Sequence, residues 1–261
     1  MNRKNKINSS LFFEKNLFSF YLKKRILSIK FIFCILFSIL ISFSQSTIFG
    51  RTISNQNLDE YIFWQKFLGA FSLAIFPLYF PIIITADIVS GEFSNKSAMI
   101  IYSMESRTKI LSIKLLILII SIFILNLFFF LTFLIIAFIK TSIFVSIHIF
   151  LIGFLITFIE FLFISSLTFM ISALTRNTLV SFILPFFYIS ITSFLEYFEL
   201  ELLSYNSYKM TVISFFENFL FNKQIIFSIV KNISLIIFFG LPILIMLITF
   251  YCFKQLDIRI D

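Results

Sequence analysis

Glu160 is an acidic side chain in the middle of a long apolar run, residues 143–173. A carboxylate near the centre of a membrane-crossing helix costs about 2.5 to 3.5 kcal/mol on insertion scales, so it must face other helices or a wet cavity and find polar partners. Two interpretations follow for this position. Glu160 either accepts hydrogen bonds from Ser165, Asn126 or another buried hydroxyl, or it lies with Asn126 along a translocation path through the helices.

Few other residues could support catalysis. The single histidine, His148, lies in the apolar sequence F-V-S-I-H-I-F, where a packed neutral side chain is the simpler interpretation and a ligand or proton relay the alternative. The five glycines form neither G-x-x-x-x-G-K-[ST] nor G-x-G-x-x-G, the patterns of phosphate-binding loops. His148 and Glu160 would lie about 18 Å apart along one helix. We therefore expect no enzymatic activity, no metal site and no cofactor in this chain.

A polar stretch between two apolar runs covers residues 87–114. It begins at Asp87, continues through S-G-E at Ser90–Glu92, and ends at Lys114. Its middle part, from Phe93 to Tyr102, fits a short helix with an apolar side and a polar side. We expect this helix to lie along the membrane surface, where it would offer the chain's main contact with the aqueous phase.

The composition is that of an integral membrane protein. Of 261 residues, 60% are hydrophobic and only 13% are charged, with a mean hydropathy of +1.04, whereas about a quarter of the residues in soluble proteins are charged. Apolar runs of about 20 residues recur, the length that a helix needs to cross a bilayer core about 30 Å thick. These runs predict an all-α fold with six transmembrane helices, near residues 31–49, 67–85, 115–139, 143–173, 179–197 and 233–253.

The distribution of lysine and arginine predicts the orientation. With six spans, 15 of these residues fall on the side of both termini and six on the other, so the positive-inside rule places both termini in the cytoplasm. The net charge of +8 then reflects topology and contact with anionic lipid, without nucleic acid. The predicted regions are a cytoplasmic tail with an interfacial helix (1–30), the membrane domain (31–253) with its cytoplasmic loop 87–114 and outer loop 198–232, and a cytoplasmic tail (254–261).

Two shorter segments have the apolar spacing of interfacial helices. The first precedes the first span on the cytoplasmic side, and the second is a membrane-dipping segment in the outer loop. Their apolar residues are Phe13, Leu17, Phe20 and Tyr21 in the first, and Val212, Phe215, Phe216, Phe219 and Leu220 in the second.

The stretch 87–114 resembles the inner loop of the permease subunit of type-2 ABC exporters, the ABC-2 type transporter family. In that family an acidic residue ending the second span is followed by S-G-E, a basic turn, an aliphatic run, P-x-S-R, and a lysine that starts the next span. The matching residues are Asp87, Gly91, Glu92, Ser106, Arg107 and Lys114. Two places differ, because Lys96–Ala98 replaces the usual arginine, glycine and threonine, and Met104–Glu105 stands where proline is usual. The order of predicted segments along the whole chain is similar too.

The resemblance implies a plasma-membrane permease that dimerises with a second permease, identical or different. It also implies a separate P-loop ATPase that binds the ATP and docks on the loop 87–114. Phe93, Ile100 and Ile101 would fill a cleft in that ATPase, while Glu92 and Arg107 would lie at the exposed rim. The implied docking residues are Asp87, Gly91, Glu92, Phe93, Lys96 and Arg107.

Two other classes of function compete with this one. A stand-alone ion-coupled or facilitative carrier would use Glu160 as its coupling site and is expected to contain an internal repeat, but residues 1–130 and 131–261 show no convincing similarity. A membrane-embedded enzyme would need polar catalytic groups at one depth.

Overall fold

The computed structural model describes residues 16–53, 76–95, 97–104, 106–141, 147–198, 204–220 and 229–255. Over these residues the regular secondary structure is helical and contains no strand. The predicted all-α class is therefore confirmed for the part of the chain that is described.

An N-terminal helix, Asn16–Ile26, leads into the bundle. The elements that follow are α2 (Ile29–Ile53), the 3-10 turn η1 (Phe76–Leu78), α4 (Tyr79–Thr85), α5 (Ser90–Ser94), α6 (Ala98–Met104), α7 (Arg107–Thr141), α8 (Ile147–Thr175), α9 (Thr178–Tyr197), α10 (Tyr205–Leu220) and α11 (Ile229–Gln255).

Among the described helices, α7, α8 and α11 are long and apolar enough to cross a membrane. The N-terminal helix and α2 meet at an angle of 49° and make a fourth crossing if they count as one span. Helix α9 is a shorter apolar helix over Thr178–Thr192. The first part of the predicted second span, 67–75, lies outside the described residues, and its remainder, 76–85, corresponds to η1 and α4. The described residues thus contain three to four helices of membrane-crossing length.

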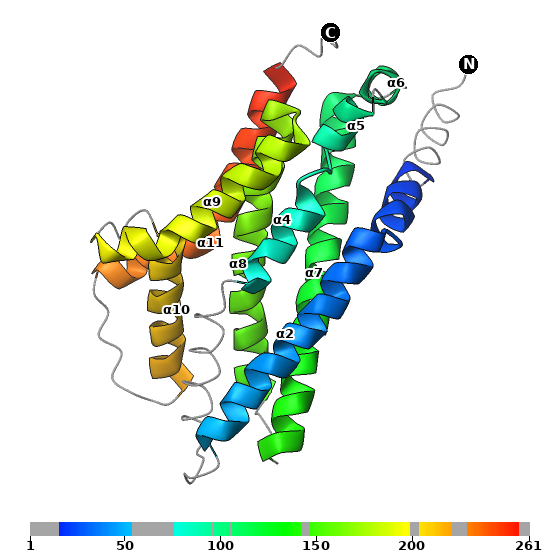
Figure 1. Ribbon diagram of the computed structural model, residues 1–261. Helices are drawn as coiled ribbons and strands as arrows, with labels where there is room; N and C mark the ends of the chain where they lie inside the picture. Colours follow the sequence, from blue (N-terminus) through cyan, green and yellow to red (C-terminus); the bar gives the residue numbers. More distant parts are fainter. Residues whose placement is uncertain are drawn as a thin grey trace, which may run out of the picture.

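Helix α7 packs against both α2 and α8, and α8 packs in turn against α9, α10 and α11 (Figure 1). Aromatic rings fill the α7–α8 contact, with Phe129 and Phe161 6.1 Å apart and Phe130 and Phe150 5.1 Å apart between ring centroids. A hydroxyl joins α2 to α7, because Ser42 Oγ donates to the carbonyl oxygen of Phe129 at 3.1 Å. Buried aromatic pairs and small hydroxyls are typical contacts between membrane helices.

Helices α5 and α6, the N-terminal helix and the C-terminal end of α11 lie at one end of the molecule, the top of Figure 1. The turn between α8 and α9 lies at the same end. These are the segments that the charge distribution places on one side of a membrane. We call this the basic end.

Two helix limits differ from those predicted. Helix α7, which corresponds to the third predicted span, begins at Arg107, eight residues before the predicted Leu115. Its helical structure continues beyond the apolar run into polar residues. The single helix expected over Phe93–Tyr102 is instead two short helices, α5 and α6. They separate at Asn95–Ser97, where the backbone N–H and Oγ of Ser97 both donate to the carbonyl oxygen of Glu92, at 3.0 and 3.3 Å. Serine and asparagine favour such turns over a helix interior.

Candidate functional site

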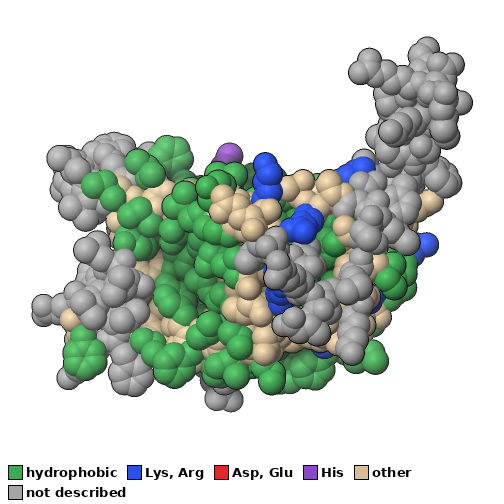
Figure 2. Space-filling view, turned by 90° about the horizontal axis from the view of Figure 1, so that it is seen from above, with side chains coloured by type: hydrophobic (Ala, Val, Ile, Leu, Met, Phe, Trp, Pro, Cys, Tyr) green, Lys and Arg blue, Asp and Glu red, His purple; other side chains and the backbone are tan. Residues whose placement is uncertain are grey.

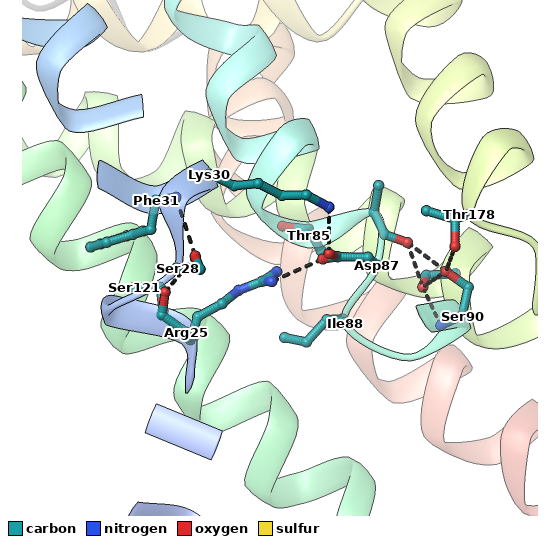
Figure 3. Close-up of polar contacts among 12 residues, drawn as sticks. Arg25, Ser28, Lys30, Phe31, Thr85, Asp87, Ile88, Ser90, Ser121 and Thr178 are labelled. Atoms are coloured by element: carbon teal, nitrogen blue, oxygen red, sulfur yellow. Dashed lines mark hydrogen bonds and ion pairs between the residues drawn. The ribbon is translucent and has the colours of Figure 1, made fainter. Parts of the chain in front are cut away.

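Asp87 joins the N-terminal helix and α2 to the beginning of the polar stretch. Arg25 Nη1 lies 2.8 Å from Asp87 Oδ1, and Lys30 Nζ lies 2.7 Å from Oδ2, so that both cations converge on one carboxylate (Figure 3). Burial alone would raise the pKa of Asp87, but the charge of Arg25 and the hydrogen bonds from Lys30 and Arg25 lower it below its usual value. Asp87 therefore stays ionised at neutral pH and holds both cations.

Glu92 is buried, with 7% of its surface exposed. Its Oε1 accepts a hydrogen bond from the hydroxyl of Tyr21 at 2.5 Å, and its Oε2 pairs with the ammonium of Lys114. Lys114, whose side chain is 1% exposed, also donates to the carbonyl oxygen of Ile88 at 2.9 Å. Burial and the charge of Glu92 raise the pKa of Tyr21, which keeps the phenol protonated as a donor. The expected position of Glu92 at an exposed rim is wrong, because its carboxylate is the counter-ion of a buried lysine.

Ser90 joins α5 to the ends of α8 and α9. Its backbone N–H donates to Ser172 Oγ at 3.0 Å, and its own hydroxyl lies 3.1 Å from Thr178 Oγ1 (Figure 3). Between these two helices Arg176 adopts a left-handed backbone conformation, with φ of 56°, which non-glycine residues adopt rarely and mostly at tight reversals. The turn brings the guanidinium of Arg176 to 5.1 Å from the ring centroid of Phe93.

Phe93 is half-buried and belongs to this inner packing. Its ring stacks on Tyr102 of α6 at 6.0 Å, and Tyr102 contacts Phe253 of α11 at 5.7 Å between ring centroids. Burial and the charge of Glu92 raise the pKa of Tyr102 above its usual value. Among the described side chains of α6, Ile100 is apolar and exposed, with 61% of its surface accessible.

The six predicted docking residues therefore have different environments. Asp87, Glu92 and Phe93 each contact other elements of the basic end, and Glu92 is buried while the other two are partly buried. A Cβ built on Gly91 would lie 3.4 Å from the Cβ of Asp87, an ordinary contact, so packing does not require glycine there. Arg107 is the half-exposed first residue of α7, and Lys96 lies outside the described residues.

Glu160 has a partner that the sequence did not suggest. Lys209 Nζ of α10 lies 2.8 Å from Glu160 Oε1, and the two side chains are only 2% and 7% exposed. Of the expected partners, Asn126 instead donates through Nδ2 to the carbonyl oxygen of Phe154 at 3.1 Å, and Ser165 Oγ has no partner among the described residues. The structure does not bring Asn126 and Glu160 into contact, since Phe154 lies about 9 Å before Glu160 along α8.

Helix α10 is held against α8 and α11 by its first residue as well. The ring of Tyr205 stacks on Phe163 of α8 at 3.7 Å and on Phe238 of α11 at 5.1 Å. Its hydroxyl donates to the carbonyl oxygen of Phe238 at 3.0 Å. Tyr205, Lys209 and Val212 share the buried face, and this spacing of four and three residues was a signal that Lys209 lies inside the bundle. His148, by contrast, is exposed in the first turn of α8.

The polar contacts at the basic end join one short segment to several helices. Through Asp87, Glu92 and Ser90, the segment 87–95 is bonded to the N-terminal helix, α2, α7, α8 and α9. In the part of the chain that is described, no three residues of the types His, Cys, Asp and Glu are grouped as metal ligands.

A scan against protein-family models and a search of curated proteins give no match for this chain.

Proposed function

We propose that this chain is the permease subunit of an ATP-driven ABC exporter in the plasma membrane, and that a separate P-loop ATPase docks on α5 and α6. The observation that carries the proposal is the bonding of the segment 87–95 to five other helices. In this mechanism, ATP-driven movement of the ATPases pushes α5 and α6, and the ion pairs of Asp87 and Glu92 transmit the movement to the bundle. Two permease chains, identical or different, would form the pathway.

Of the apolar anchors expected from the sequence, Ile100 is the one that we retain for the ATPase contact. Phe93 is engaged by Tyr102 and Arg176, whereas Ile100 is 61% exposed on α6. Apolar anchors at the centre of an interface carry most of its binding energy, and exposed rim charges carry little. Asp87 and Glu92 then have the role of transmitting force, not of contacting the partner.

Ile100→Asp is expected to abolish ATPase docking while leaving the bundle folded. The tagged wild type, Ile100→Asp and the matched control Ile147→Asp are purified from membranes of the source cell. Ile147, the first residue of α8, is 68% exposed and lies at the opposite end of the molecule. Loss of a central anchor of about 2 kcal/mol weakens binding about 30-fold. The measurement is the amount of co-purified P-loop ATPase, from mass spectrometry and ATP hydrolysis.

The wild type and Ile147→Asp should retain the ATPase, and Ile100→Asp should lose it. Absence of a P-loop ATPase from the wild-type preparation, or equal retention by all three proteins, would refute the docking proposal.

The proposed topology places the basic end in the cytoplasm. Single cysteines are introduced at Asn95 and Asn218 in a background in which Cys34 and Cys252 are alanine. Position 218 lies near the end of α10, beyond Lys209, which packs against the middle of α8. We therefore choose position 218 as the probe of the outer side. A membrane-impermeant thiol reagent applied to intact cells is expected to label Asn218→Cys at once and Asn95→Cys only after permeabilisation. The reverse pattern would show the opposite orientation.

The buried pair of Glu160 and Lys209 favours a second candidate, a stand-alone ion-coupled carrier. Ionisable pairs within membrane helices often mark ion or proton pathways, and this pair lies near the middle of α8. The two candidates differ in a simple experiment, since a carrier of this kind transports its substrate in vesicles without ATP or an ATPase.

A further inference from the structure

A basic pocket lies between the N-terminal helix, the beginning of α2, the segment 87–97 and α7. It has a volume of about 370 Å³. Charged side chains line much of it, four of them cationic and two anionic: Lys24, Arg25, Lys30, Lys114, Asp87 and Glu92. The bend between the N-terminal helix and α2 creates this space, and the hydroxyl of Ser28 at the bend is part of its wall.

The two carboxylates do not neutralise the four cations. Asp87 is shared by Arg25 and Lys30, and Glu92 pairs with Lys114. Lys24 is exposed and makes no ion pair with any residue that the structure describes. The pocket therefore has an excess of two positive charges. Figure 2, which looks down on the basic end, shows basic side chains grouped over part of this face and no acidic side chain among the described residues in view.

Arg25 has unused hydrogen-bonding capacity beside the pocket. Its Nη1 binds Asp87, but Nε and Nη2 are buried and lack a partner among the described residues. These two nitrogens form one edge of the guanidinium, and such an edge pairs with two oxygens of a phosphate or carboxylate. A buried charged donor without a partner is costly. Arg25 lines the pocket, and a turn of its side chain would present this edge to a phosphate oxygen bound there.

The pocket is continuous with an apolar stripe on the outside of α2. Ile29 lines the pocket and is 86% exposed, and further exposed side chains follow at helical spacing on the same face: Phe33, Leu36 and Leu40. In a membrane protein this stripe faces acyl chains. A phospholipid whose headgroup entered the pocket could therefore lay its chains along α2.

We propose that this pocket binds a phosphate group carrying net negative charge, and that the headgroup of an anionic phospholipid supplies it. The excess charge and the free guanidinium edge select the anion, and the stripe on α2 selects a ligand with acyl chains. Binding would hold the N-terminal helix, α2 and the segment 87–97 together at the membrane surface. This inference does not depend on an ATPase partner.

The test uses the full chain purified in a neutral, phosphate-free detergent. Phosphatidylglycerol, phosphatidylcholine of the same acyl length, and inorganic phosphate are titrated separately, and bound ligand is measured by native mass spectrometry and calorimetry. The pocket variant is Lys24→Gln with Lys30→Gln, and the control is Lys23→Gln with Lys254→Gln, which removes the same charge from exposed positions outside the pocket. Lys24→Gln alone is included because it leaves both contacts of Asp87 intact. Thermal unfolding confirms that each variant is folded.

The wild type and the control should bind phosphatidylglycerol more tightly than phosphatidylcholine. The pocket variant should bind phosphatidylglycerol at least about tenfold more weakly, since each lysine near an anionic lipid surface contributes on the order of a several-fold factor. If inorganic phosphate binds tightly, if the pocket variant weakens that binding, and if neither lipid is preferred, the pocket is a phosphate site whose ligand comes from solution. Equal losses in the pocket variant and the control, or no binding of any of the three ligands, would overturn the proposal.

Discussion

Replacing Lys209 with methionine is expected to destabilise the protein by about 3 to 5 kcal/mol, because it leaves the carboxylate of Glu160 buried without its counter-ion. The two side chains are 2% and 7% exposed and lie between α8 and α10. Methionine has nearly the length of the lysine stem, so the change removes the charge and leaves little empty space. The measurement is thermal or denaturant unfolding of the purified protein in detergent.

The double variant Glu160→Gln with Lys209→Met separates the charge from the packing. It removes both ions, and replacing a buried pair by neutral residues is often neutral or stabilising, so we expect most of the lost stability to return. Glu217→Gln is the control on the same helix, at a half-exposed carboxylate, and is expected to change stability by less than about 1 kcal/mol. If Lys209→Met were as stable as the wild type, the ion pair would not hold α10 to the bundle.

Glu92→Gln is expected to have the second large effect, a loss of about 3 kcal/mol, because the amine of Lys114 would lose its counter-ion in a buried position. The change also weakens the hydrogen bond from Tyr21, which joins the N-terminal helix to α5. We therefore expect the N-terminal helix to separate from the bundle before the whole protein unfolds. Limited tryptic cleavage after Lys23 or Lys24 should become faster in this variant, alongside a lower unfolding temperature.

Glu92→Arg would be a poor test of whether Glu92 transmits movement from α5 to the bundle. An arginine at this position would place a second cation against Lys114 in a buried site, so the variant would lose stability along with any function. The matched test is Glu92→Gln together with Lys114→Met, which removes both charges. This double variant should recover the stability of the bundle, and wild-type stability of Glu92→Gln by itself would contradict the assigned role of the pair.

Several helices could be predicted from the sequence because their causes are local. The predicted runs 143–173, 179–197 and 233–253 correspond to α8 (Ile147–Thr175), α9 (Thr178–Tyr197) and α11 (Ile229–Gln255). An apolar run of this length satisfies its backbone groups through hydrogen bonds four residues apart, and in lipid there is no alternative partner. The composition thus determined the helical class, and the apolar runs determined the positions of these long helices.

The polar contacts were decided by tertiary structure. Tyr21 and Glu92 are 71 residues apart, and Glu160 and Lys209 are 49 apart. Whether such side chains meet depends on how far each helix is rotated and shifted against its neighbours, which no local pattern specifies. Lys209 illustrates the difference, because it falls within the predicted outer loop 198–232, whereas in the structure it shares the buried face of α10 with Tyr205 and Val212. The sequence by itself determined the helical class and the approximate positions of the long apolar helices, and only their packing decided which ions are buried together.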